Sequence, residues 1–298
     1  MPGKLDPREI FRLRPGSTGL SQKLTRHRPG RVTESICCWT DLLGFGGPLA
    51  EAAWTPSKAL WEKLFNRVAE AHACCYRNLD ASNEFVLTLN DGIIRSCVLE
   101  QISHLDELSM WLRACVFTHN WINEREEYKK MPGARTVLAH GQKLEHGVAG
   151  ITVEDLVANY TKRDPKGPSR LPRKVAMRSV ALNPLPLQLN LAFSKVYILD
   201  QLGSRGGIAG PHFYVDQSLL DIAARLAKKH KLLPLIDSRS ETGRTLAVPK
   251  RDRSYYHFGF VLEEPGIQVE TRKIKTTVWR VLEFHPWDEP QPFTLKVF

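Results

Sequence analysis

Two aspartates of this chain lie in sequence contexts that could bring their carboxylates together. Asp41 follows the apolar run at 36–40, and Asp91 lies in a later Asn-Asp-Gly tripeptide between two runs rich in strand-forming residues. Converging carboxylates hold divalent cations, and two such ions about 3.5 to 4 Å apart can stabilise both the attacking and the leaving oxygen of a phosphoryl transfer. Mg²⁺ and Mn²⁺ prefer oxygen ligands of this kind. The pair therefore suggests phosphoryl chemistry, provided that the fold makes the two acids neighbours.

The turn after Asp41 offers a second chemical possibility, because Gly44, Phe45, Gly46 and Gly47 follow it closely. Glycines let a backbone approach a ligand, so the N–H groups of such a turn, near the start of a following helix, can donate to phosphate oxygens. We therefore expect Gly44, Phe45 and Gly46 to bind substrate. Taken alone, the glycines would be an ordinary loop and Phe45 a core residue.

The elements around these residues follow a recognisable order. Hydrophobic periodicity and turn residues predict a strand at 35–40, a helix at 57–78, a hairpin at 84–99, a helix at 105–129 and a strand at 134–141. This β-α-β-β-α-β order is that of a ferredoxin-like palm, an α+β fold with a mostly antiparallel sheet and helices on one face. In a palm sheet the end of the first strand and the tip of the central hairpin are adjacent. We therefore expect the two aspartates to face one site.

The two helices are predicted from apolar side chains repeated at spacings of three, four and seven. Pro56 marks the start of the first helix. The side chains expected to pack are Leu60, Trp61, Leu64, Phe65, Val68 and His72 in the first helix, and Leu108, Trp111, Leu112, Cys115, Val116 and His119 in the second.

Composition limits the class of protein. The 298 residues are 42% hydrophobic and 25% charged, which suits a globular chain of one elaborated domain or two small ones. No apolar stretch reaches 18 residues and the N-terminus lacks a secretory core, so we expect a cytoplasmic protein without a membrane span. The six cysteines form no C-x-x-C pair. We expect them to be reduced and to pack as small apolar residues.

The formal charge of +10 favours anionic partners without choosing among them. Two basic stretches, at 1–31 and 161–174, contain many prolines and glycines and little apolar periodicity. A flexible arm and a surface loop are the preferred interpretation, with a nucleic-acid site as the less favoured alternative. We divide the chain into a basic arm (1–32), a catalytic domain (33–230) and a C-terminal α/β extension of that domain (231–298). A helix at 216–230 and strands at 254–262 and 276–284 are expected in the latter part.

The segments that contain Asp41 and Asp91 resemble motifs of a known family. The segment Asp41-Leu42-Leu43-Gly44-Phe45 is similar to the Asp-Ile-x-Gly-Phe motif of class III nucleotidyl cyclase catalytic domains, and the Asn-Asp-Gly tripeptide is similar to that family's second metal aspartate. The stretch at 133–147 looks like the family's fourth strand. The stretch at 189–216 resembles its Asn-x-Ala helix, with Asn190 and Ala192 at the matching places. The resemblance covers about 33–217 and is carried by motifs.

The resemblance implies a reaction and a partner. Two Mg²⁺ or Mn²⁺ ions would lie on Asp41, Asp91 and the Leu42 carbonyl, and the ribose 3′-hydroxyl of a nucleoside triphosphate would attack its own α-phosphorus and release pyrophosphate. The product would be a 3′,5′-cyclic nucleotide. In this family the active site forms between two catalytic domains, which implies a homodimer in which Asn190 acts on the transition state.

Two departures from the family pattern concern the residue that reads the base and the cation that acts on the transition state. The position that commonly reads a purine base is Leu87, which offers no hydrogen bond. The position of the transition-state arginine, four residues after Asn190, is Ser194; Lys195 beside it is the expected substitute, with Arg178 and Arg205 as other cations. Because Arg is a planar fork and Lys a point charge, this replacement is not neutral.

These departures, with the FSKVY and GPHFYVD segments, look most like the bacterial pyrimidine cyclases of anti-phage defence. The resemblance then implies that UTP, or less readily CTP, is cyclised to a second messenger for a separate effector protein. Two alternatives remain open. One is a catalytically degenerate nucleotide-binding regulator, and the other is a nucleic-acid binder whose affinity depends steeply on salt.

Overall fold

The structure of the chain is a computed structural model. It describes residues 31–79, 84–99, 105–144, 185–229, 235–241, 243–250, 256–286 and 293–295. Most of the basic arm, the loop at 161–174 and Arg178 lie outside these residues. The chain divides into two compact units, Met1–Val32 with Leu144–Leu189, and Thr33–Lys143 with Asn190–Phe298. The second unit carries Asp41, Leu42, Gly44, Phe45, Gly46, Asp91, Asn190 and Lys195.

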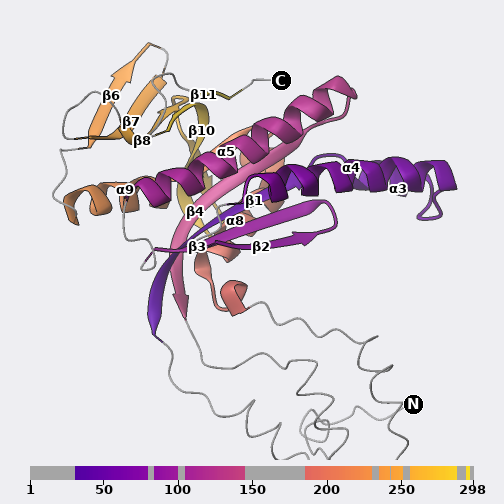
Figure 1. Cartoon of the computed structure of the whole chain (residues 1–298), viewed down its shortest axis with the longest axis horizontal. Coiled ribbons are helices and arrows are strands. Elements are labelled where there is room, and N and C mark those ends of the chain that lie inside the picture. Colours follow the sequence, from indigo (N-terminus) through magenta and orange to yellow (C-terminus); the bar gives the residue numbers. More distant parts are fainter. Residues whose placement is uncertain are drawn as a thin grey trace, which may run out of the picture. The chain divides into compact units, whose positions relative to one another are not determined.

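The predicted β-α-β-β-α-β order is confirmed (Figure 1). In chain order the elements are β1 (Val32–Leu42), α3 (Gly46–Glu51), α4 (Lys58–Arg77), β2 (Glu84–Leu89), β3 (Gly92–Val98), α5 (Leu105–Tyr128) and β4 (Ala134–Leu144). Short helix α3 was not expected. Helix α4 begins after Ser57, whose hydroxyl accepts the Leu60 N–H at 3.3 Å, a cap that contributes about 1 kcal/mol.

The later elements are η2 (Leu185–Leu187), α8 (Leu191–Leu202), η3 (Gly203–Gly206), β5 (Phe213–Asp216), α9 (Gln217–Lys229), β6 (Ile236–Ser240), β7 (Gly243–Pro249), β8 (Tyr256–Leu262), β9 (Ile267–Glu270), β10 (Lys275–His285) and β11 (Phe293–Thr294). The predicted helix at 216–230 is therefore α9. The predicted strands at 254–262 and 276–284 are β8 and β10, which pair antiparallel as expected.

One sheet runs through the second unit in the order β2-β3-β1-β4-β5-β10-β8-β7-β6. Its first four strands have the palm order. β1 pairs antiparallel with β3, as do β2 with β3 and β5 with β10, whereas β4 pairs in parallel with β5. Strand β10 lies between β5 and β8, so the C-terminal strands extend the same sheet. The predicted α+β palm with a C-terminal β extension is confirmed.

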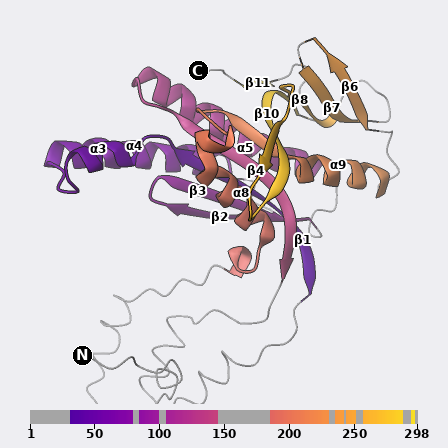
Figure 2. The ribbon, with the colours of Figure 1, turned by 180° about the vertical axis from the view of Figure 1, so that it is seen from behind.

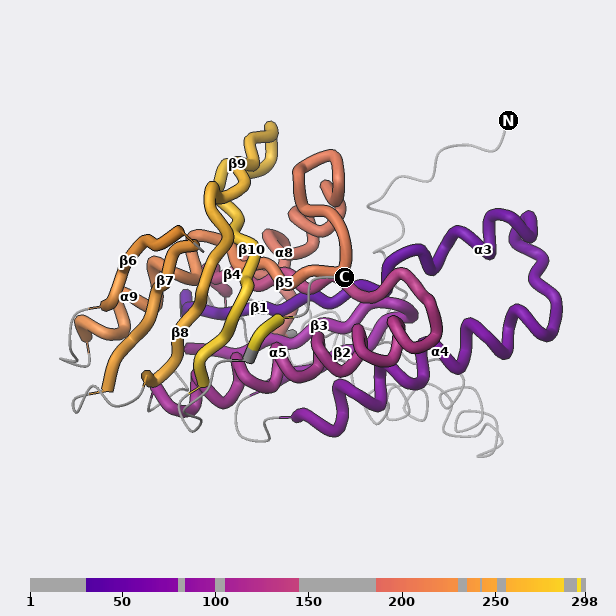
Figure 3. Tube along the Cα trace, turned by 90° about the horizontal axis from the view of Figure 1, so that it is seen from above, coloured from indigo at the N-terminus to yellow at the C-terminus, as the bar shows by residue number. Residues whose placement is uncertain are grey.

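Alternate residues of β1 meet different helices, because successive side chains of a strand point to opposite faces. Cys38 packs in the apolar cluster with α5 residues, while Trp39 contacts Phe193 and Tyr197 of α8. Figure 1 shows α4 and α5 on one face of the sheet, and Figure 2 shows α8 on the other. The view from above separates these two helix layers clearly (Figure 3). Helix α8 is thus an addition to the one-sided arrangement expected from the sequence.

The core explains why the strands and helices hold together. Apolar side chains of β1, α5, β5, α9, β7, β8 and β10 form one buried cluster, which includes Trp111, Phe213 and Phe260. Each such side chain contributes about 1.5 to 3 kcal/mol by leaving water. The six cysteines are buried and free, as expected. None of the described helices combines the length and apolar character that crossing a membrane requires.

Candidate functional site

The strand register brings the two predicted aspartates to one place. Asp41 is opposite Gly92 in the β1–β3 pair, and the Leu42 N–H donates to the Asp91 carbonyl at 3.1 Å. The turn that carries Asp91 is tight because Asn90 adopts a left-handed conformation at φ +54°. Both acids therefore lie at the same end of the sheet.

The electrostatics of Asp41 show how closely other acids surround it. Burial, together with Asp200 and Asp91, raises the pKa of Asp41 to about 7, against the opposing effect of Arg135 and Arg67. A carboxyl group with this pKa is about half protonated at neutral pH. A divalent cation would displace that proton, because a metal ligand must be ionised.

Asp200 and Arg135 belong to this environment and were missed from the sequence. The Arg135 Nε and Nη2 atoms donate to Asp200 Oδ1 at 2.8 and 2.6 Å, and Nη2 also donates to the Asp200 carbonyl at 3.0 Å. Burial raises the pKa of Asp200, and Arg135 opposes this shift. The sequence signal for this pair was Asp200 itself, an acid within the apolar segment LAFSKVYILDQL. A buried carboxylate needs a cationic partner, so Asp200 indicated that a cation lies beside it.

The turn after Asp41 is only partly available to a ligand. Gly44 adopts φ +68°, a conformation that favours glycine. Phe45 is buried with Leu49 and Leu64, so only its backbone could contact substrate. Gly46 begins α3, and a Cβ built on Gly46 would meet no atom within 4 Å. Substrate binding by these three residues remains a prediction.

Asn190 lies away from the aspartates and already has a structural role. It caps α8, with its Oδ1 accepting the Phe193 N–H at 3.1 Å, and its Nδ2 donates to Ser35 Oγ at 3.1 Å. Ser35 is six residues before Asp41 in β1, which corresponds to roughly 20 Å along the strand. Within one chain, Asn190 therefore does not join the aspartate site.

Lys195 is also engaged within the chain. Its Nζ donates to Asp216 Oδ1 at 3.0 Å and to Ser218 Oγ at 2.9 Å. Asp216 is fully buried and accepts another hydrogen bond from Thr276. Lys195 thus neutralises a buried acid, and a role on substrate would require it to leave that acid. Its predicted catalytic role is untested by this geometry.

The donor set at the aspartate site fits Mg²⁺ or Mn²⁺. Asp41, Asp91 and the Leu42 carbonyl would supply oxygen ligands only, as hard cations prefer. The described part of the chain contains no group of three or more His, Cys, Asp or Glu residues placed to hold a metal by itself. Mg²⁺ sites with two protein carboxylates complete their coordination with substrate phosphates and water. Residues 41, 42 and 91 match that kind of site.

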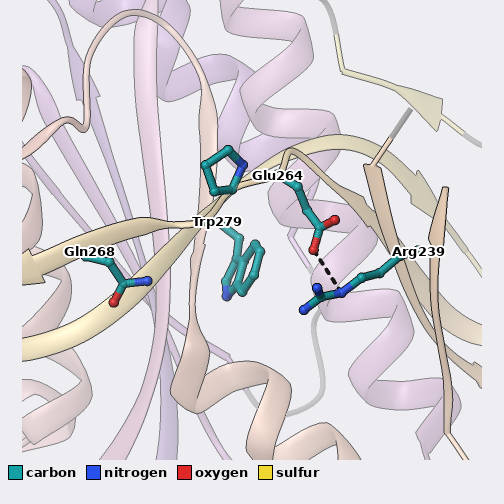
Figure 4. A pocket seen from close by; sticks show the side chains of 6 residues that line it. Arg239, Glu264, Gln268 and Trp279 are labelled. Atoms are coloured by element: carbon teal, nitrogen blue, oxygen red, sulfur yellow. Dashed lines mark ion pairs between the residues drawn. The ribbon is translucent and has the colours of Figure 1, made fainter. Parts of the chain in front are cut away.

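A second concavity lies in the C-terminal strands, apart from these residues. It encloses about 420 Å³ and is lined by Arg239, Glu264, Pro265, Gly266, Gln268 and Trp279. Figure 4 shows the ion pair on its wall, in which Arg239 Nε is 3.2 Å from Glu264 Oε1. None of the predicted site residues lines it.

Comparison with known proteins yields structural likeness only. No protein-family model matches the chain, and no curated protein matches it. Among solved structures, the chain is similar to the guanylyl cyclase Cya2, with a TM-score of 0.47 and 10% identity over 90% of this chain and 100% of that one. It is also similar to the adenylyl cyclase CyaB from P. aeruginosa, with a TM-score of 0.39 and 8% identity over 85% and 96% of the two chains.

A third similar structure is the guanylate cyclase domain of RhGC from Catenaria anguillulae in complex with GTP. The TM-score is 0.41 at 11% identity, over 84% of this chain and 97% of that one. Likeness of this degree does not establish a shared activity, because one fold serves many functions.

Proposed function

We propose that this chain is a nucleotidyl cyclase that forms a 3′,5′-cyclic nucleotide and pyrophosphate from a nucleoside triphosphate. The observation that carries the proposal is the register that pairs Asp41 with Gly92 and so places Asp91 beside it. Two aspartates from segments far apart in the sequence are thus close enough for Asp91 to raise the pKa of Asp41. Converging carboxylates are what a two-cation phosphoryl site requires.

The chain's own residues have defined tasks in this proposal. Asp41, Asp91 and the Leu42 carbonyl hold the cations, and the backbone of Gly44, Phe45 and Gly46 faces the phosphates. When bound, Mg²⁺ or Mn²⁺ neutralises phosphate charge and acidifies the attacking 3′-hydroxyl. Asn190 and Lys195 keep their proposed catalytic roles only if a partner chain approaches and their present hydrogen bonds rearrange.

The finer proposal is a pyrimidine cyclase that acts on UTP, or less readily on CTP, in anti-phage defence. Its support is the motif resemblance together with Leu87, which lies half-buried in β2 opposite Ile94 and offers no polar atom to a purine edge. The cyclic product would be read by a separate effector protein.

We further propose that the active unit is a homodimer. Asn190 and Lys195 do not reach the aspartates of their own chain, so a second copy would have to complete the site. Apolar side chains of α8 and the hairpin are exposed, among them Tyr197 and, farther from the aspartates, Leu191 of α8, and Leu89 at the hairpin. Tyr197 contacts Trp39, whose ring lies against Gly92, so this surface is continuous with the aspartate site.

The test is incubation with Mn²⁺ and all four ribonucleoside triphosphates, followed by mass spectrometry of the products. We expect one pyrimidine triphosphate to yield its cyclic monophosphate, and Asp41→Ala or Asp91→Ala to lower turnover at least 100-fold. Asp221→Ala, at an exposed position in α9, is the matched control and should retain activity. Equal turnover in all three variants would remove the proposal.

A degenerate nucleotide-binding regulator is the second candidate. It is favoured by Ser194 at the arginine position and by the internal engagement of Lys195. This alternative predicts that nucleotide binding depends on Asp41 but that no cyclic product forms.

A further inference from the structure

A buried ion pair lies directly behind the turn that follows Asp41. Arg67 of α4 and Glu126 of α5 are both nearly inaccessible to solvent. The Arg67 Nε donates to the two carboxylate oxygens of Glu126 at 3.1 and 2.8 Å, and its Nη2 is 2.6 Å from Glu126 Oε2. The guanidinium is therefore held in one orientation by two helices.

The same guanidinium binds the backbone of the turn. Arg67 Nη2 donates to the Leu43 carbonyl at 2.8 Å and to the Gly133 carbonyl at 3.5 Å. The Leu43 N–H donates to the same Gly133 carbonyl at 2.8 Å. Both backbone polar groups of Leu43, two residues after Asp41, are thus engaged with fixed partners.

The second partner, Gly133, is itself anchored. Asn123 of α5 accepts the Ala134 N–H at 2.7 Å with its Oδ1 and donates to the Ala134 carbonyl at 3.1 Å with its Nδ2. Gly133 adopts φ +85°, and a Cβ there would lie 2.6 Å from Asn123 Oδ1. Helix α5 therefore holds both the arginine and the segment that it bridges to the turn.

The buried Arg67–Glu126 pair is an inefficient way to stabilise the fold. Removing two charges from water costs several kcal/mol per ion, and apolar residues of similar volume often replace a buried pair without loss of stability. A bridge that orients a ligand turn has a different benefit, because cation ligands must be held to within about 0.5 Å of the productive geometry.

We propose that Arg67 is a positioning residue for the cation site. Held by Glu126, it fixes the Leu43 backbone and thereby the Asp41 carboxylate and the Leu42 carbonyl that precede it. This inference rests on the proposed function of the two aspartates. It assigns Arg67 no contact with substrate.

The test compares Arg67→Lys with Arg95→Lys in the whole 298-residue chain. Arg95 forms an equally buried pair with Glu84, but its other bonds go to the Asn78 carbonyl and to Thr118, not to the turn. Lysine keeps the charge in both variants and loses the planar fork that reaches several partners. Mn²⁺ affinity is measured by electron paramagnetic resonance of the free ion, at a temperature where thermal melts show both variants folded.

We expect Arg67→Lys to bind Mn²⁺ at least fivefold more weakly than Arg95→Lys, and a smaller difference would overturn the inference. If Arg67→Lys does not fold, Glu126→Gln is compared with Glu84→Gln by the same criterion. Wild-type protein that binds Mn²⁺ through Asp41 but yields no cyclic product would overturn the proposed function and leave this comparison decisive. Wild-type protein that binds no Mn²⁺ would overturn both.

Discussion

At the scale of single residues, the Asp41 carboxylate lies where burial and neighbouring acids disfavour its ionised form. Asp41 lies among buried groups with Asp200 and Asp91 nearby, and burial is the main cause of its raised pKa. A group whose pKa is raised on folding binds more protons in the folded than in the unfolded chain, so stability falls as pH rises from about 4 to 7. Retention of an acid that weakens the metal-free fold is expected of a cation ligand, the role proposed for Asp41.

Asp41→Asn should therefore stabilise the metal-free protein while abolishing turnover. Above pH 7 the asparagine removes the penalty of the buried charge, and we expect a gain on the order of 1 to 2 kcal/mol after allowance for partial exposure. Thermal denaturation at pH 8 in a chelator measures this gain, which should vanish at pH 4. Adding Mn²⁺ should raise the melting temperature of the wild type only. A less stable variant at pH 8 would show that nearby arginines already compensate the charge.

At the scale of elements, packing between the β2–β3 hairpin and β1 determines where Asp91 lies relative to Asp41. Gly92 does not have a positive φ, so its backbone conformation does not require glycine. Glycine is needed there because a side chain would have no room. A Cβ there would lie 2.7 Å from the Trp39 ring, which packs in turn against Phe193 and Tyr197. The close approach of β3 to Trp39 keeps the tip carrying Asp91 beside Asp41.

Gly92→Ala should thus displace the Trp39 ring and move the hairpin tip. We expect a loss of about 1 to 3 kcal/mol of stability from overpacking, with a disproportionate loss of Mn²⁺ affinity. Gly47→Ala is the matched control, since no atom lies within 4 Å of a Cβ there and alanine favours the helix by up to about 1 kcal/mol. Urea denaturation with Mn²⁺ titration measures both effects. Equal behaviour of the two variants would contradict this role for Gly92.

At the scale of the whole molecule, helix α8 distinguishes the two faces of the sheet. Helices α4 and α5 cover one face, and α8 lies on the other, where it leaves apolar side chains exposed. Tyr197 is 44% exposed and Tyr128, at the end of α5, is 89% exposed. Only Tyr197 is continuous with the aspartate site, through Trp39. The proposed dimer should therefore use the α8 face.

Tyr197→Glu should weaken self-association at least tenfold and reduce turnover with it, because a charge would be buried at the contact. Leu191→Glu, at a second exposed position of α8, should act in the same way. Tyr128→Glu should leave both properties unchanged. Sedimentation velocity over a concentration series, with turnover measured at each concentration, checks this prediction. A wild-type chain that is monomeric and active would contradict it.

Local sequence patterns were sufficient for the palm elements other than α3, and for the positions of Asp41 near the end of a strand and Asp91 at a hairpin tip. Hairpin chemistry at Asn90-Asp91-Gly92 and the apolar spacing of α5 depend on neighbours in the chain, and all six side chains predicted to pack in α5 are buried. In α4 the same periodicity included Trp61 and Phe65, which are 56% and 69% exposed. Spacing defines a stripe on a helix, but packing decides how much of that stripe is covered.

Tertiary structure alone decided the rest of the site. Arg135 and Asp200 pair across 65 residues of sequence, and Arg67 reaches Glu126 and Leu43 from a different helix. Asn190, singled out by a motif, is a helix cap in this chain. Such pairings depend on which side chains a fold brings within hydrogen-bond distance. No local pattern of residue types records that information.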